Sequence, residues 1–248
     1  MAKKERRYRR RKRNILFLPV AFVLVCLALV LGLSVFFKVS VIEVEGNSLY
    51  TDEEVIEASG IQMGDNLLFV NRFSVDGRIL SRLPYVDRVI SVDRSLPNRV
   101  TITVQESTAM AVLDVDGTDW ILDQNCKVLG EAEQTQGYIE IRGITAQTPV
   151  VGATVTGELE EGQKLQLLSQ LLTEIRDRNM QQDITWLDLS NIANPIFDYM
   201  GRFTVWMGTE DGLSYKFDKL LSTVAQLEEG DVGTIDLSID EKVHFRYE

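Results

Sequence analysis

The hydrophobic pattern begins with an apolar run at residues 15–37 that contains no charged side chain. At about 1.5 Å per residue, the run forms a helix of roughly 35 Å, long enough to cross a hydrocarbon core of about 30 Å. The run exceeds the apolar region of a cleavable signal peptide, and it ends in bulky Val35, Phe36 and Phe37, where cleavage needs small residues. We therefore predict an uncleaved membrane helix, with a cleaved export signal or a buried core helix as alternatives.

The pattern after this run predicts a strand, two helices and two further strands. Residues 39–45 alternate like a strand, and the capping-box sequence from Thr51 to Glu54 starts the first helix. Ser74 is expected to cap the second helix, and strands are predicted at 86–94 and 100–106. Elements in this order form a compact unit, with the helices on one face of a three-stranded sheet.

From Met110 the chain changes to short strands separated by turn residues. The Asp116-Gly117 pair predicts a hairpin because both residues accept positive φ values. Two helices interrupt the strands, one at 158–179 with a regular leucine stripe and one capped by Asp218. The predicted strands are 109–115, 120–122, 127–129, 138–143, 184–189, 203–207, 213–217, 233–239 and 242–247. The expected fold class is α+β, and its second domain is mixed α/β with a mainly antiparallel sheet.

Charge indicates how the chain is oriented in a membrane. Residues 1–14 hold nine basic side chains and only Glu5 as an acid, which predicts a cytoplasmic N-terminus and export of everything after the span. Residues 39–248 carry 16 basic and 36 acidic side chains, a balance that disfavours nucleic acid as a partner. We interpret the basic tail as a signal for membrane orientation that also contacts anionic lipid headgroups. The alternative is a short arm that contacts nucleic acid. The two cysteines, Cys26 in the span and Cys126 beyond it, do not suggest a disulfide.

The sequence offers little for catalysis or metal binding. A nucleophile pair of Cys126 and the single histidine, His244, would need an orienting group and an oxyanion site, and no motif marks either. The acidic loop that starts at Asp114 resembles a calcium loop. Its glycine, Gly117, falls at the fourth position and Asn125 at the twelfth, which does not match the EF-hand pattern. We predict no enzyme activity, no cofactor and no metal.

The last strand is the candidate binding site. A sheet that ends at the C-terminal strand commonly leaves one edge open, and an extended partner segment adds there by β-augmentation. Four apolar or aromatic residues near this edge are the predicted partner-binding residues: Ile239, Val243, Phe245 and Tyr247. The alternative is that they only complete the internal core.

Several sequence fragments resemble one known family. The fragments I-E-V-E-G-N at 42–47, G-D-N-L-L-F at 64–69, L-P-Y-V-D-R-V at 83–89 and L-P-N-R-V-T-I-T-V-Q-E at 96–106 resemble a POTRA domain. Directly after a single span, this domain resembles the bacterial division proteins FtsQ and DivIB. The fragments W-I-L-D, V-W-M-G and T-I-D-L-S-I-D resemble the β domain of the same family. The chain departs from the family at Ser238 and Ile239, where an arginine and an aromatic residue often stand.

The resemblance implies a basic cytoplasmic tail at 1–14, a transmembrane helix at 15–37, a POTRA domain at 38–107 and an FtsQ-type β domain at 108–248. It implies a non-enzymatic scaffold at the division septum that binds FtsB/DivIC-type and FtsL-type proteins and helps regulate septal peptidoglycan synthesis. Because the family usually has a glycine near Cys126, Asn125 is expected to adopt the left-handed conformation. A membrane-tethered cell-wall or peptide hydrolase, and a POTRA receptor for exported peptides using the strand edge near 86–94, are the alternatives.

Overall fold

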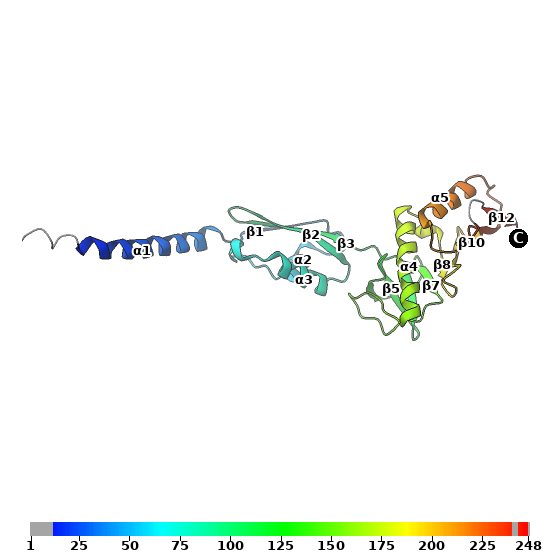
Figure 1. Ribbon diagram of the computed structural model, residues 1–248, viewed down its shortest axis with the longest axis horizontal. Coiled ribbons are helices and arrows are strands. Elements are labelled where there is room, and N and C mark those ends of the chain that lie inside the picture. Colours follow the sequence, from blue (N-terminus) through cyan, green and yellow to red (C-terminus); the bar gives the residue numbers. More distant parts are fainter. Residues whose placement is uncertain (1–11, 240–242, 248) are drawn as a thin grey trace, which may run out of the picture. The chain divides into compact units, whose positions relative to one another are not determined.

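The computed structural model describes residues 12–239 and 243–247. Helix α1 (Lys12–Phe36), blue in Figure 1, contains the span of residues Phe17–Phe36. Among the described residues it is the one helix long and apolar enough to cross a membrane. The described chain divides into two compact units: unit 1 comprises residues 12–79, which include α1, and residues 88–105, and unit 2 comprises residues 80–87, 106–239 and 243–247.

Unit 1 has the predicted order of elements after the span. The three strands form a sheet in the order β1-β3-β2, and β1 runs parallel to β3. Both helices lie along one face of this sheet (Figure 1). The elements are β1 (Val41–Glu45), α2 (Asp52–Ser59), η1 (Leu67–Phe69), α3 (Arg72–Arg82), β2 (Val86–Ser95) and β3 (Arg99–Glu106).

The helix starts in unit 1 show one correct and one wrong prediction. The capping box is present, because Thr51 accepts from the backbone N–H of Glu54 while the Glu54 carboxylate accepts from the N–H of Thr51. Ser74 does not cap α3. The helix begins two residues earlier, and the Asn71 side chain accepts from the N–H of Phe73 at 3.1 Å. Asparagine is as good an N-cap residue as serine, and Asn71, which comes first in the chain, caps the helix.

Unit 2 is built on a nine-stranded sheet in the order β12-β11-β10-β9-β8-β7-β4-β5-β6. Five of its neighbouring pairs are antiparallel and three are parallel. The expected α+β class, with a mainly antiparallel sheet in the second part, is confirmed. The strands are β4 (Ala111–Val115), β5 (Thr118–Leu122), β6 (Val128–Glu131), β7 (Ile139–Arg142), β8 (Trp186–Asp188), β9 (Ile196–Tyr199), β10 (Phe203–Trp206), β11 (Gly233–Asp236) and β12 (His244–Tyr247).

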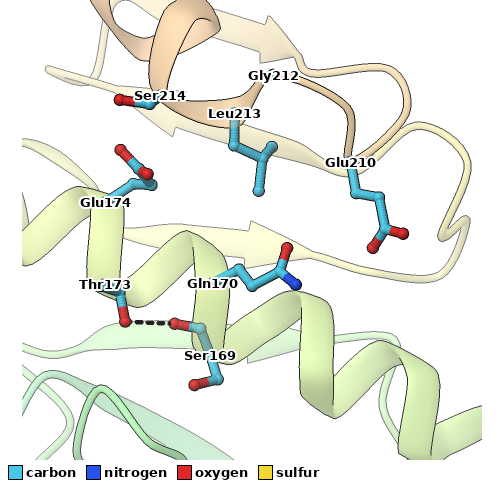
Figure 2. A pocket seen from close by; sticks show the side chains of 8 residues that line it. All are labelled: Ser169, Gln170, Thr173, Glu174, Glu210, Gly212, Leu213 and Ser214. Carbon is cyan, nitrogen blue, oxygen red and sulfur yellow. Dashed lines mark hydrogen bonds between the residues drawn. The ribbon is translucent and has the colours of Figure 1, made fainter.

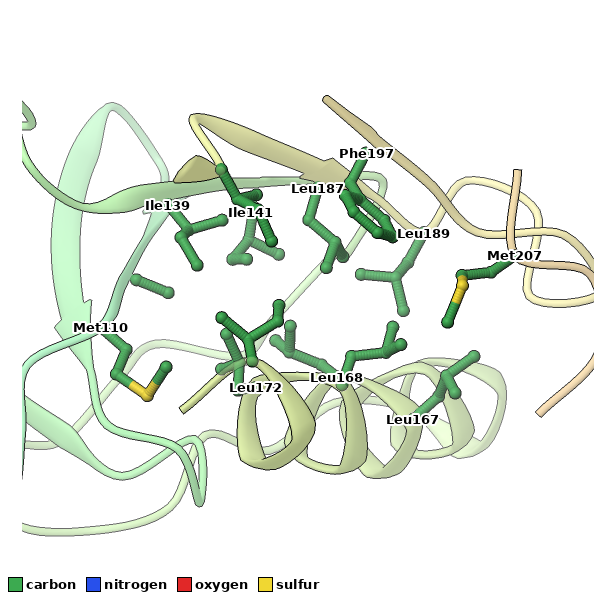
Figure 3. Packing of buried hydrophobic residues seen from close by; sticks show 14 of the residues in the cluster. Met110, Ile139, Ile141, Leu167, Leu168, Leu172, Leu187, Leu189, Phe197 and Met207 are labelled. Atoms are coloured by element: carbon green, nitrogen blue, oxygen red, sulfur yellow. The ribbon is translucent and has the colours of Figure 1, made fainter. Parts of the chain in front are cut away.

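The core of unit 2 lies between this sheet and two helices, α4 (Leu159–Asp177) and α5 (Leu213–Val224). Figure 3 shows Leu168 and Leu172 of α4 directed at Ile141 and Leu187 of the central strands, and all four are buried. Leucines three or four residues apart share one helix face, which explains why this helix was recognisable from its stripe.

The second helix of unit 2 begins earlier than predicted. Residues 213–217, expected as a strand, form the first turns of α5, and Asp218 lies inside the helix instead of capping it. Leu213, Phe217 and Leu220 are spaced by four and three residues and are all buried on one helix face. The Phe217 ring stacks on Phe197 of β9 with centroids 6.0 Å apart. Strand β9 was not predicted from the sequence.

Turn geometry in unit 2 confirms one expectation and corrects another. Asp116 and Gly117, between β4 and β5, have φ values of 56° and 84°, as the hairpin requires. In the next turn Cys126, at φ 57°, takes the left-handed conformation expected of Asn125. The Asp123 carboxylate accepts from the N–H groups of Asn125 at 2.8 Å and Lys127 at 2.9 Å, and this arrangement places residue 126 at the tightest point.

Candidate functional site

Strand β12 is an outer strand of the unit 2 sheet among the residues that the structure describes. It pairs antiparallel with β11, which places Gly233 opposite Tyr247 and Ile235 opposite Phe245. On its other side β11 runs parallel to β10. The sequence therefore predicted the position of the open edge correctly.

The backbone of β12 has a definite orientation at this edge. Gly233 donates to the Arg202 carbonyl at 3.1 Å, and Leu237 donates to the Trp206 carbonyl at 2.8 Å, so both residues face β10. Backbone groups alternate sides along a strand, so Thr234 and Asp236 face β12, opposite Arg246 and His244. The N–H and C=O groups of Phe245 and Tyr247 consequently point away from β11. They lie where an added strand would form its ladder.

The side chains of β12 divide between the core and solvent. The Phe245 ring contacts the Phe203 ring of β10 edge to face, with centroids 5.9 Å apart. Val243 and Phe245 are half-buried and pack against the core of unit 2. Tyr247 contacts Phe245 at 4.6 Å between centroids and remains 70% exposed. Tyr247 therefore has the largest free surface of the three, whereas Phe245 has a structural role as well.

The fourth predicted residue, Ile239, lies apart from this row. It follows β11, outside any strand, and half of its surface is exposed. Three of the four predicted residues thus share the terminal segment of the sheet, and Ile239 lies in the connection that leads to it. Their role in binding a partner stays a prediction.

Sequence reasoning missed a glycine that the edge requires. A Cβ atom at Gly233 would overlap the carbonyl oxygen of Arg246 and lie 3.1 Å from the Phe245 ring. The φ value of Gly233 is not positive, so glycine is needed here for close approach and not for backbone conformation. No motif around residue 233 reveals this, because the requirement arises from the pairing of β11 with β12.

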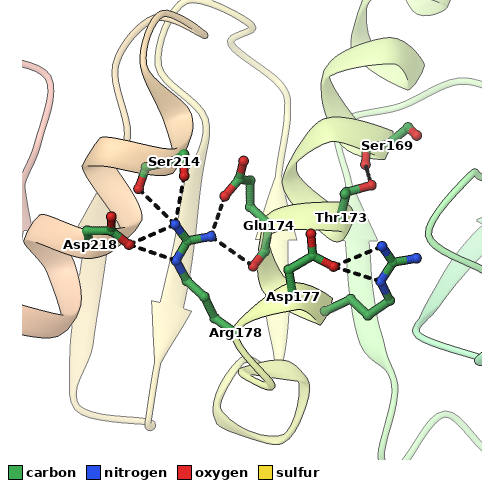
Figure 4. A network of polar contacts seen from close by, with 8 residues as sticks. Ser169, Thr173, Glu174, Asp177, Arg178, Ser214 and Asp218 are labelled. Carbon is green, nitrogen blue, oxygen red and sulfur yellow. Dashed lines mark hydrogen bonds and ion pairs between the residues drawn. The ribbon is translucent and has the colours of Figure 1, made fainter.

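An ion-pair network joins the two helices that cover the sheet. Arg178, directly after α4, contacts Glu174 of α4 and Asp218 of α5, with the Asp218 bond at 2.7 Å (Figure 4). The same guanidinium donates to the backbone oxygen of Ser214 at 3.0 Å and lies 5.6 Å from the Phe217 ring centroid. One arginine therefore links α5 to α4.

Beside this network lies an open groove of about 430 Å³. Figure 2 shows its polar side chains, which come from α4 and from the segment at the start of α5. Its acids are Glu174, already paired with Arg178, and Glu210. The residues that line it are Ser169, Gln170, Thr173, Glu174, Glu210, Gly212, Leu213 and Ser214. They include no histidine, lysine or cysteine, and the hydroxyl groups of Ser169 and Thr173 donate to backbone carbonyls and not to Glu174 or Glu210.

The Cys126 and His244 pair is not assembled. Cys126 precedes β6 at one edge of the sheet and His244 belongs to β12 at the other. Eight strand spacings of about 4.8 Å separate these edges, roughly 38 Å before twist. Burial, with a smaller contribution from Asp123, raises the pKa of the Cys126 thiol to about 12, which disfavours the reactive thiolate. Within the described residues no three His, Cys, Asp or Glu side chains are grouped as metal ligands would be.

A second strand edge exists in unit 1, where β2 is an outer strand of the described sheet. Its middle is less open than that of β12, because the Ile90 carbonyl accepts from the Arg72 guanidinium at 3.0 Å. Side chains that occupy edge carbonyls oppose strand addition. The two edges therefore differ in how readily they accept a partner strand.

Comparison with known proteins agrees with these features. The family model of the FtsQ-type POTRA domain matches residues 37–107. The cell division protein DivIB of Clostridium acetobutylicum is 28% identical over 204 residues, which cover 81% of this chain and 79% of that protein. DivIB of Clostridium botulinum is 25% identical and covers 96% of this chain and 91% of its own length. FtsQ of Corynebacterium glutamicum is 32% identical across half of this chain and 57% of its own length.

The structure and these similarities define a class, an α+β chain with an apolar N-terminal helix, a POTRA domain and a β-rich domain. The resemblance to the FtsQ and DivIB cell division proteins that the sequence indicated is confirmed. These relatives support a role in cell division, and together with α1 they fit a single-pass membrane protein.

Proposed function

We propose that the chain is a non-enzymatic membrane scaffold of the division machinery and that β12 captures an extended segment of a partner. The observation that carries this proposal is the outer position of β12, with the backbone of Phe245 and Tyr247 directed away from β11. The proposed partners are small single-span coiled-coil proteins of the FtsB/DivIC and FtsL type. Bringing them together at the septum would help regulate septal peptidoglycan synthesis.

The N-terminal segment supports the proposed location. The nine basic residues among residues 1–14 favour a cytoplasmic N-terminus, and with it an exported position for the part of the chain after the span. The span then holds the units at the membrane, and the captured partner holds the chain at the septum. No step of this mechanism needs a catalytic group.

The energetics of strand capture require both backbone and side chains. Each new backbone hydrogen bond contributes about 0.5–1.5 kcal/mol net, so a few of them give only a few kcal/mol. Tyr247 adds an exposed aromatic surface next to the ladder, and aromatic residues are common anchors of interfaces. We therefore expect Tyr247 to act through its N–H group as well as its ring.

Two substitutions at residue 247 separate these contributions. Tyr247→Ala removes the ring alone, whereas Tyr247→Pro also removes the N–H that points away from β11. Strand addition predicts that pull-down of the coiled-coil partner falls with the alanine variant and falls further, by about two- to tenfold, with the proline variant. Thermal unfolding of both variants should stay close to that of the parent chain, because Tyr247 is exposed and proline is tolerated on edge strands.

Arg246→Pro is the matched control for the backbone direction. Its N–H lies on the side that faces β11, so this variant should lower the stability of the terminal strand as well as partner binding. If Tyr247→Pro binds the partner and supports septal localisation as well as Tyr247→Ala does, strand addition at β12 is wrong.

A further inference from the structure

The end of unit 1 nearest the membrane span carries two exposed apolar tips. Phe69, the last residue of η1, is 83% exposed, and Leu96, in the turn between β2 and β3, is 67% exposed. Neither side chain has a place in the core of the unit. Large apolar side chains at exposed tips are typical of surfaces that contact a membrane or another protein.

Backbone hydrogen bonds attach both tips to the segment that leaves the span. The Leu67 N–H donates to the Phe37 carbonyl at 2.8 Å, and Phe37 directly follows α1. On the other side of the same segment, the Ser40 N–H donates to the Asn98 carbonyl at 2.9 Å. Phe69 and Leu96 are each two residues from one of these attachment points, within about 8 Å of chain.

The tips are also connected to each other. The Arg94 guanidinium, at the end of β2, donates to the Leu68 carbonyl of η1 at 3.1 Å. Leu96 follows two residues after Arg94, and Phe69 directly follows Leu68. This contact holds the turn and η1 at one end of unit 1, the end from which the span departs.

From this geometry we propose that Phe69 and Leu96 insert into the interface of the lipid bilayer that α1 crosses. The proposal rests on the membrane span of the proposed function and adds a lipid-binding surface to it. The polar region of a bilayer is only about 5–8 Å thick on each side of the hydrocarbon core, so side chains this close to the end of a span reach it. A bilayer is the expected occupant because the apolar surface continues the apolar span in the chain.

Insertion would fix unit 1 to the membrane at three points, the span and the two tips. A domain attached only through its chain rotates freely about that connection, whereas one with apolar anchors has a preferred face toward the lipid. This seating would therefore orient unit 1 relative to the membrane surface.

The test uses the full chain reconstituted into vesicles of phosphatidylethanolamine and phosphatidylglycerol, with either ordinary or brominated acyl chains. Phe69→Trp and Leu96→Trp introduce a reporter at each tip, and the fluorescence of the parent chain, with its three tryptophans, is subtracted. The matched control is Leu159→Trp, because Leu159 is 90% exposed and lies in unit 2 at the start of α4.

We expect brominated lipid to quench the added fluorescence at residues 69 and 96 by about half or more, and to leave that at residue 159 nearly unchanged. Quenching at residue 69 or 96 that does not exceed that at residue 159 overturns the proposal. Flotation with the vesicles reports the span independently. A chain that does not float would refute the span of the proposed function and this inference with it, whereas a floating chain with unquenched tips would refute the inference alone.

Discussion

At the scale of single residues, close approach decides which positions the C-terminal edge tolerates. Gly233 packs so tightly against β12 that any side chain would meet the Arg246 carbonyl. Phe245 depends on the same approach, because its ring lies against both residue 233 and Phe203. The close packing of β12 on the sheet therefore depends on Gly233 in the neighbouring strand β11.

We predict that Gly233→Ala, a substitution outside β12, loosens that strand. The new methyl group must displace the Arg246 carbonyl, and overpacking of this kind costs about 1–3 kcal/mol. Urea unfolding followed by fluorescence should show this loss, and limited proteolysis should release the C-terminal residues faster.

Gly230→Ala is the control for this substitution. A Cβ atom at Gly230 meets no atom within 4 Å, and the φ value there is not positive. This variant should match the parent chain or be slightly more stable, because alanine restricts the unfolded chain. Equal stability of the two alanine variants would contradict the tight approach of β11 and β12.

The residue scale also shows where sequence reasoning stops. Asp116 and Gly117 were predictable because a two-residue hairpin requires positive φ at both positions. The left-handed conformation of Cys126 was not, because it follows from the two N–H groups that the Asp123 carboxylate binds. Residue type alone favoured Asn125 for the left-handed conformation, but the hydrogen bonds of Asp123 place Cys126 in it.

At the scale of elements, the packing of α5 on α4 depends on few polar groups. Arg178 makes its contacts with only 16% of its side chain exposed, so its ion pairs are less screened than those on the open surface. The guanidinium fork binds acceptors on both helices at once, which a lysine ammonium on a flexible stem does less well.

We predict that Arg178→Ala destabilises unit 2 by about 1–3 kcal/mol, because Glu174 and Asp218 lose their common partner and Phe217 loses cover. Arg176→Ala is the matched control two residues away, since its ion pair with Asp177 is exposed and should contribute within about 0.5 kcal/mol. Chemical denaturation measures both. Similar losses in the two variants would mean that Arg178 is no more than a surface ion pair.

The prediction of elements from the sequence succeeded where one period dominates. The leucine stripe of α4 and the alternation in β3 each have a single interpretation. Residues 213–217 alternate between apolar and polar like a strand, but Leu213 and Phe217 are also four residues apart, as on one face of a helix. Both side chains are buried in the core, and the segment forms a helix. Strand β9 has only four residues and follows Asn194-Pro195, a loop signal, so nothing local revealed it.

The sequence indicated which strand is an outer strand of the sheet. It did not indicate the contacts that hold this strand in place. The last strand of a sheet commonly leaves one side unpaired, which made β12 a reasonable candidate, and it is an outer strand among the described residues. The requirement for Gly233 and the core contact of Phe245 depend on how β12 sits against β11 and β10. Such contacts arise between strands and leave no signal within either.

At the scale of the whole molecule, two of the outer strands of the described sheets, β2 and β12, are the candidate partner sites. The β2 edge suits a POTRA receptor for exported peptides, and the β12 edge suits capture of a coiled-coil division protein. In β2 the Arg72 guanidinium already occupies the Ile90 carbonyl, whereas the outward backbone of β12 at Phe245 and Tyr247 faces away from its neighbour. The β12 edge should therefore be the stronger acceptor of an added strand.

Photo-crosslinking from both edges in dividing cells tests this preference directly. A photoreactive amino acid replaces Tyr247 in one strain and Ile90 in another, and both positions are exposed, so neither substitution disturbs a core. We expect the coiled-coil partner to crosslink to residue 247 at least about tenfold more than to residue 90, since strand addition is favoured only at β12. Crosslinks to that partner, or to exported peptides, mainly from residue 90 would instead assign the binding site to the POTRA domain and leave β12 as a structural strand.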